Sequence, residues 1–143
     1  MSRVSQNLLS PNYLEEIQSS FDWAISKLSK EEEIKNFFDE FLTRSERIML
    51  AKRLILIFLI SKEFDAISIY SILKVSPTTV VYFKEKFQKR PENFQPVLDQ
   101  LARRESLKNL FKKIEKFIEP VAAFMPPATK SEVLKKLRRI SRS

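Results

Sequence analysis

Glycine, cysteine and histidine are all absent from this chain of 143 residues. Without Gly, it lacks the phosphate-binding loops that need a left-handed residue or a close approach of the backbone. Without Cys and His, zinc fingers, thiol nucleophiles and His-based triads are excluded. A catalytic site would have to consist of carboxylates, Lys or hydroxyls alone. We therefore expect no enzyme, no catalytic residues and no metal site.

Long apolar runs and targeting signals are also missing. The most apolar stretch, Leu54 to Ile60, is far shorter than the roughly 20 residues that a membrane span needs. The first seven residues lack the apolar run of a signal peptide, and a chain without Cys is compatible with the cytosol. We expect a soluble, cytoplasmic protein without a membrane partner. Hydrophobic residues make up 43% of the chain, enough for a globular core.

The net charge of +8 is unevenly distributed. Residues 1–64 carry nine Lys/Arg and ten Asp/Glu, whereas residues 65–143 carry seventeen and eight, so the halves have charges of −1 and +9. A basic half of this kind favours a polyanionic partner. Lysine-rich helix faces that only keep a protein soluble produce the same pattern. The charge alone leaves both interpretations open.

Apolar residues recur at helical spacing almost throughout, which predicts an all-α fold. Ser10-Pro11 opens a first helix, and the pairs Ser29/Glu32, Thr43/Glu46 and Thr129/Glu132 have the spacing of capping boxes at three later helix starts. Shorter helices are expected at about 66–73 and 77–90, and a longer one over 107–121. Pro91 and Pro96 are interpreted as bracketing a break, and Pro120, Pro126 and Pro127 as ending the longer helix.

The helix that follows Thr43 is apolar on nearly every side. It contains Ile48, Met49, Leu50 and Ala51, and then the run from Leu54 to Ile60. A helix of this kind is normally buried on several sides. A single chain of short helices has difficulty covering it, so the pattern favours a homodimer whose core includes this segment.

Residues 65–84 have the spacing of a helix-turn-helix, in which packing fixes the apolar positions. The expected core positions are Ile69, Leu73, Val75, Val80 and Phe83. Ser76 is a good N-cap and Pro77 a good first residue for the second helix. The outward face, which in such motifs enters the major groove, and the basic end of the helix give the candidate DNA-binding residues: Ser76, Thr78, Thr79, Val81, Tyr82, Lys86, Lys89 and Arg90.

Two positions depart from the usual helix-turn-helix pattern. Lys74 stands where the turn normally has Gly, and Tyr70 where the first helix normally has a small residue. The face over residues 76–86 also lacks Arg, Asn and Gln, the residues that make bidentate contacts to bases. Thr78 and Thr79 can bond to several bases, so modest sequence selectivity with a strong dependence on salt is expected.

Three elements in order resemble the Trp-repressor-like family over about residues 34–90. They are the box Leu42-Thr43-Arg44-Ser45-Glu46-Arg47, a long core helix with an arginine, and a helix-turn-helix that ends in the pattern running from Ser76 to Val80. The resemblance implies an intertwined all-α homodimer that places two recognition helices in successive major grooves.

The resemblance also implies an effector pocket, but the residues of this chain match the pocket of the family only in part. The tryptophan-binding threonine of the family falls on Thr43, the carboxylate-binding arginine on Arg53 and a recognition-helix threonine on Thr79. The arginine that stacks on the indole falls on Tyr82, which supplies neither that charge nor that contact. We therefore expect that the protein has no cofactor and that tryptophan is not its corepressor. Arg53 is better explained as an ion-pair partner in the core helix.

These observations predict a helical segment over 1–33, a Trp-repressor-like helix-turn-helix core over 34–90 and a basic helical extension over 91–143. The predicted function is that of a DNA-binding transcriptional regulator that acts as a homodimer on duplex DNA. Two alternatives remain: a helical protein-interaction module that has lost DNA binding, and a nonspecific binder of polyanions or membrane surfaces. Within the extension, the apolar stripe over 107–121 is expected to pack on the core. For the basic tail from Lys130 to Arg142, attraction to phosphate or a membrane surface and plain solvation both remain open.

Overall fold

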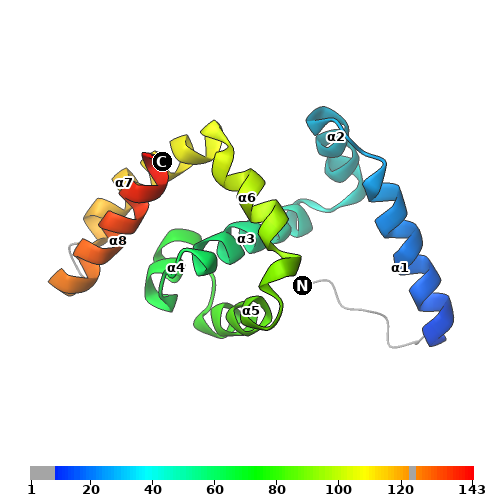
Figure 1. The fold of residues 1–143 in the computed structure, drawn as a ribbon, viewed down its shortest axis with the longest axis horizontal. Helices are drawn as coiled ribbons and strands as arrows, with labels where there is room; N and C mark the ends of the chain where they lie inside the picture. Colours follow the sequence, from blue (N-terminus) through cyan, green and yellow to red (C-terminus); the bar gives the residue numbers. More distant parts are fainter. Residues whose placement is uncertain (1–8, 123–124) are drawn as a thin grey trace. The chain divides into compact units, whose positions relative to one another are not determined.

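The computed structural model describes residues 9–122 and 125–143. These residues form eight α-helices and one short 3-10 helix, and none of them lies in a strand, so the predicted all-α fold is confirmed (Figure 1). The elements are α1 (Pro11–Ser26), α2 (Glu31–Phe41), α3 (Arg44–Ser61), α4 (Ala66–Leu73), α5 (Pro77–Lys89), the 3-10 helix η1 (Pro91–Asn93), α6 (Gln95–Arg103), α7 (Glu105–Ala122) and α8 (Pro127–Ser141).

Side chains fix the starts of α1 and α3 as the sequence predicts. Ser10 caps α1 by accepting a hydrogen bond from the Tyr13 amide, and Pro11 is the first helical residue. At the start of α3 the capping box is reciprocal. The Thr43 amide donates to Glu46 Oε2 at 2.8 Å, and the Glu46 amide donates to Thr43 Oγ1 at 3.2 Å. Both exchanges satisfy amide groups that have no partner within the helix.

Two other predicted capping boxes are wrong. The N-cap of α2 is Lys30 instead of Ser29, and its side chain makes no capping hydrogen bond. Three consecutive glutamates, Glu31 to Glu33, occupy the first turn instead and interact favourably with the positive end of the helix dipole. Helix α8 likewise begins at Pro127, before Thr129, because proline is well suited to a first helical position.

The prolines predicted the break after α5 but not the end of α7. The α-helical structure is interrupted between Lys89 and Gln95, as Pro91 and Pro96 predict, although the interval contains η1 and each proline lies in the first turn of a helix, η1 and α6 respectively. In that turn an amide has no partner within the helix, so proline costs little. Pro120 does not end α7, which continues to Ala122.

The chain divides into two compact units, Met1–Ala51 and Lys52–Ser143. In the described part of the first unit, α1 and α2 contain no buried residue. Phe21 and Phe37 each stack on Phe41, with ring centroids 5.9 and 5.0 Å apart. Large apolar side chains such as Leu14 and Ile17 on α1 remain exposed.

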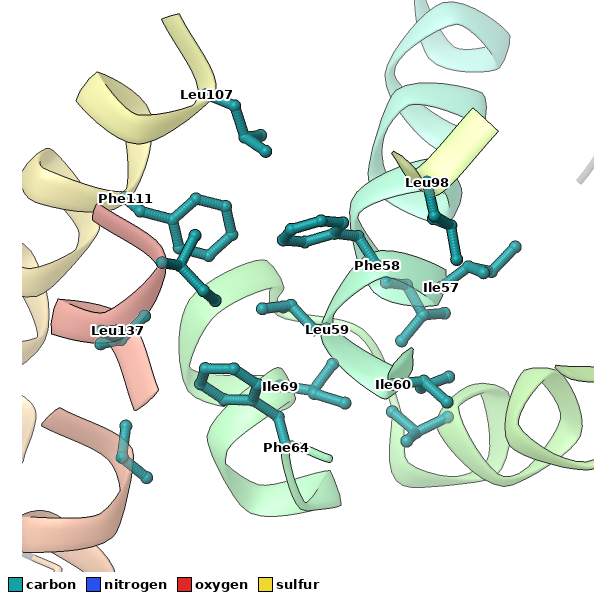
Figure 2. Packing of buried hydrophobic residues seen from close by; sticks show 14 of the residues in the cluster. Ile57, Phe58, Leu59, Ile60, Phe64, Ile69, Leu98, Leu107, Phe111 and Leu137 are labelled. Atoms are coloured by element: carbon teal, nitrogen blue, oxygen red, sulfur yellow. The ribbon is translucent and has the colours of Figure 1, made fainter. Parts of the chain in front are cut away.

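The second unit contains the main hydrophobic core. Its centre is the end of α3, where five consecutive residues, Leu56 to Ile60, are buried. Phe58 of α3 faces Phe111 of α7 with ring centroids 5.7 Å apart, and Ile69 of α4 lies beside them (Figure 2). Buried residues of α5, α6 and α8 complete the cluster, so the helices after α3 share one core.

Helices α7 and α8 pack side by side as a hairpin at the end of the chain (Figure 1). Among the described residues, no single helix is both long and apolar enough to cross a membrane, although α4 and α5 taken together, bent by 115°, pass the same test of length and composition.

Candidate nucleic-acid interface

Helices α4 and α5 have the geometry of a helix-turn-helix. The chain bends by 115° between them, across the three residues from Lys74 to Ser76. Helix-turn-helix motifs join two helices at about 90–120° through a turn of three or four residues. The arrangement therefore fits a motif whose second helix is presented for docking.

The turn is formed without glycine. Lys74 adopts the left-handed conformation, with φ of 55° and ψ of 43°, and its amide donates to the Tyr70 carbonyl at 2.8 Å. An L-residue pays about 1–2 kcal/mol for this conformation, which explains why Gly is the usual choice at such a position. Lys74 therefore keeps the turn at an energetic cost.

The start of α5 follows the sequence prediction closely. The Ser76 hydroxyl accepts from the Thr79 amide at 3.3 Å, and Pro77 is the first residue of the helix. The hydroxyls of Ser76 and Thr79 also share a hydrogen bond of 2.9 Å. This cap fixes the first turn of α5, and two of the candidate base-contacting residues belong to it.

The predicted helix-turn-helix core positions all lie against the core of the second unit. Ile69 and Val80 are buried. Leu73, Val75 and Phe83 are half-buried and pack against the same cluster. Sequence reasoning missed the two buried serines of α4, Ser68 and Ser71; Ser68 is fully buried, and its small side chain suits a helix covered by other helices. Its hydroxyl is buried without a hydrogen-bond partner, which no apolar periodicity could have indicated.

The candidate DNA-binding residues lie on α5 and at its two caps, Ser76 and Arg90. All are exposed except Thr79, which is half-buried; the exposed ones are Ser76, Thr78, Val81, Tyr82, Lys86, Lys89 and Arg90. The face therefore combines hydroxyls at the start of the helix with cations at its end. Glu85 is exposed in the same helix and is its only acidic residue.

Two lysines of this motif lie over tyrosine rings. The ammonium nitrogen of Lys86 is 5.2 Å from the centroid of the Tyr82 ring, and that of Lys74 is 5.5 Å from the centroid of Tyr70. Tyr82 and Lys86 are four residues apart in α5, the spacing at which side chains meet on one helix face, whereas Lys74 follows the last residue of α4. A cation–π contact limits the rotamers of each lysine and leaves its charge accessible. Tyr70 and Lys74 are both exposed beside the turn, and from the sequence they were recognised only as departures from the usual helix-turn-helix pattern.

The residues of the implied effector pocket are engaged within the chain. The guanidinium carbon of Arg53 lies 5.1 Å from the centroid of the Phe83 ring, which links α3 to α5. Thr79 takes part in the cap of α5, and Thr43 in the cap of α3. Thr43 belongs to the first unit, and Arg53 and Thr79 belong to the second. A common pocket for the three residues stays a prediction.

Comparison with known proteins supplies one match. Residues 15–102, more than half of the chain, match the family model described as Trp repressor protein. No curated protein and no solved structure matches the chain. The matched segment runs from α1 to the end of α6 and leaves the hairpin of α7 and α8 outside it.

Proposed function

The chain belongs to the Trp repressor family, and from this membership we propose that it is a DNA-binding transcriptional regulator. The observation that carries the proposal is the 115° bend between α4 and α5 together with the cluster of exposed hydroxyls and cations on α5. A recognition helix of this type enters the major groove with its N-terminal residues toward the bases. Here those residues are Thr78 and, one turn later, Val81 and Tyr82.

Affinity and selectivity come from different residues in this proposal. Lys86, Lys89 and Arg90 contact phosphates where the helix leaves the groove, and such contacts do not depend on sequence. Thr78 bonds to base edges, and Val81 contacts a thymine methyl group. Because the face lacks the long bidentate side chains, selectivity is modest, and affinity falls steeply as salt rises.

The regulator acts as a homodimer. Helices α1 and α2 contain no buried residue, yet Leu14, Ile17 and Phe21 of α1 are large and apolar. Apolar surface of this extent over about two helical turns favours burial against a partner. A second copy of the chain supplies that partner and presents two recognition helices one helical turn of DNA apart, about 34–36 Å.

DNA binding needs no tryptophan in this proposal. A ligand carboxylate would have to compete with the Phe83 ring for the guanidinium of Arg53. Tyr82 offers neither a second guanidinium nor its charge, and its ring already carries Lys86. The contact between Arg53 and Phe83 instead fixes α5 against α3 without a cofactor.

A protein-interaction module is the second candidate. The exposed Val81 and Tyr82 and the acidic Glu85 favour it, because apolar and mixed-charge surfaces fit a protein better than a phosphate backbone.

The test is the selection of genomic duplex fragments by the full-length protein, followed by titration of a selected duplex and of a scrambled one. Preference for the selected duplex, lost on changing Thr78→Ala, supports the regulator. Equal and weak binding of both duplexes would leave the interaction module as the better proposal.

A further inference from the structure

The C-terminal hairpin of α7 and α8 is a fixed part of the second unit. Phe111 of α7 is fully buried against Phe58 of α3, and Leu137 of α8 is fully buried in the same core. Lys136 of α8 donates to the main-chain carbonyl of Glu63, in the turn that follows α3, and its ammonium lies 5.7 Å from the centroid of the Phe64 ring. The hairpin therefore holds its surface at a set position relative to α4, on which α7 packs.

The charge of the hairpin is strongly positive. Residues 105–143 contain ten Lys/Arg and four Glu. Three of these glutamates already pair with hairpin cations: Glu105 with Lys108 at 3.5 Å, Glu132 with Lys136 at 3.1 Å and Glu115 with Arg138 at 2.7 Å. The ion pairs leave most of the cations uncompensated.

Five of the uncompensated cations lie on the outward side of α7 and α8. On α7, Lys112 and Lys116 stand opposite the buried Phe111 and Ile118, given a rotation of about 100° per residue. On α8, Lys135, Arg139 and Arg142 stand opposite the buried Val133 and Leu137 in the same way. All five cations are exposed, and none has a carboxylate partner among the described residues.

We propose that this outward basic face of α7 and α8 is a second phosphate-binding surface, which contacts duplex DNA beside the stretch that α5 reads. The inference rests on the proposed function. Helix α4, on which the hairpin packs, is the helix that crosses the DNA backbone in such motifs, so a rigid element attached to it lies near the phosphates. Charge complementarity selects the partner, since duplex DNA offers about one negative charge per 1.7 Å.

The burial of α8 favours DNA over a lipid surface. A helix that binds an anionic membrane inserts its apolar face into the headgroup region. The apolar face of α8, formed by Val133, Leu137 and Ile140, is already buried in the protein core. Phe117 of α7 is 64% exposed, so vesicles are included in the test.

The experiment uses three full-length double variants that each remove two positive charges. Arg139→Gln/Arg142→Gln and Lys112→Gln/Lys116→Gln remove uncompensated cations. The matched control, Lys108→Gln/Arg138→Gln, removes two cations that pair with Glu105 and Glu115. Glutamine is a good helix former, and helicity and thermal midpoints check that each variant keeps the fold.

Binding is measured on a random-sequence duplex of about 40 base pairs, four helical turns, over a salt series from about 50 to 200 mM. We expect each test variant to reduce the magnitude of the salt slope by about two for each protomer that uses both contacts, and the control to change it much less. Test variants that match the control would overturn the second surface.

Two further arms separate this inference from the proposed function. If Thr78→Ala changes the ranking of duplexes while the hairpin variants match the control, the recognition helix stands and the second surface is wrong. If wild type binds no duplex, both are wrong. Binding to vesicles of anionic phospholipid that exceeds binding to duplex and is lost in the hairpin variants would replace DNA with a membrane.

Discussion

The guanidinium of Arg53 lies over the ring of Phe83, with 5.1 Å between the guanidinium carbon and the ring centroid. Arg53 belongs to α3, which contributes more buried core residues than any other described helix, and Phe83 belongs to α5, the recognition helix. The contact joins the helix that supports the motif to the helix that presents it. It also engages the arginine that a bound amino acid would need.

Replacing Arg53 tests this link. Arg53→Gln is expected to lower the free energy of unfolding by about 1 kcal/mol, the scale of a partly desolvated cation–π contact. Because the position of α5 then becomes less defined, affinity for duplex should fall as well. Chemical denaturation and duplex titration measure the two effects. Arg53→Lys should retain part of both, since an ammonium is also attracted to the ring.

The control is Arg44→Gln, which changes an exposed arginine of the same helix. It should leave the unfolding free energy within about 0.5 kcal/mol of wild type. Added tryptophan should not change the affinity of wild type for duplex. A rise in affinity that depends on tryptophan would show that Arg53 leaves Phe83 to bind the ligand, and the assignment would have to be withdrawn.

The packing of α4 provides a matched pair of isoleucines. Ile69 is fully buried, whereas Ile67, two residues earlier, is 66% exposed. Ile69→Ala should therefore destabilise the protein by about 2–5 kcal/mol, and Ile67→Ala by less than about 0.5 kcal/mol. Urea denaturation monitored by circular dichroism measures both. Equal effects would mean that α4 packs through a different face.

Lys74, the left-handed residue of the turn, gives a prediction in which a substitution raises the free energy of unfolding instead of lowering it. Lys74→Gly should stabilise the protein, because Gly adopts the left-handed conformation without the penalty of about 1–2 kcal/mol. The greater entropy of Gly in the unfolded chain offsets about 0.5–1 kcal/mol, so the net gain is at most about 1.5 kcal/mol. Lys74→Val, with a β-branched side chain, should destabilise. Thermal unfolding of both variants checks the order Gly, Lys, Val, and any other order contradicts it.

The features best predicted from the sequence are those that depend on residues close together in the chain. The caps at Ser10, Thr43 and Ser76 each require two residues three apart, and all three form. Helix α6 was missed because proline was interpreted as a breaker, although it is also favoured in a first helical turn. The contact between Phe58 and Phe111 joins residues far apart in the chain, and periodicity shows only that each has an apolar face.

The same limit applies to the candidate site: its features within one helix were predicted, and its contacts between helices were not. The exposed face of α5 follows from the helical period once the motif is aligned. The engagement of Arg53 with Phe83 depends on how two helices cross, and the left-handed conformation of Lys74 on how the turn closes. Neither the crossing of two helices nor the closure of a turn can be read from residue spacing.

Dimerisation predicts a mass of about twice the 16.9 kDa of one chain in sedimentation at micromolar concentration. The exposed apolar side chains of α1 locate the expected interface, so Ile17→Asp/Phe21→Asp should shift the protein toward the monomer. Asn12→Asp/Ser20→Asp adds the same charge to exposed polar positions of α1 and should remain dimeric. A wild type that sediments as a folded monomer at this concentration would contradict the homodimer.

Glu85 and Lys86 are adjacent exposed residues of opposite charge on α5, and they distinguish the two candidate functions. If the helix leaves the major groove at this point, phosphates lie close to both side chains. Lys86→Gln should then weaken binding to every duplex and reduce the magnitude of the salt slope by about one per lost contact. Glu85→Gln should do the reverse for affinity, because it removes a like-charge repulsion and no phosphate contact.

Each variant is the control for the other, since both change a neighbouring charge to the same neutral amide. Tyr82→Leu adds a second test of the lysine, because Tyr82 holds Lys86 over its ring and leucine keeps the bulk without the cation–π attraction. It should weaken binding less than Lys86→Gln does, with a smaller change in slope. A protein-interaction surface gives a different pattern, in which duplex binding is weak throughout and none of the three variants changes it. Opposite shifts for Glu85→Gln and Lys86→Gln on duplex therefore support a recognition helix that lies against phosphate.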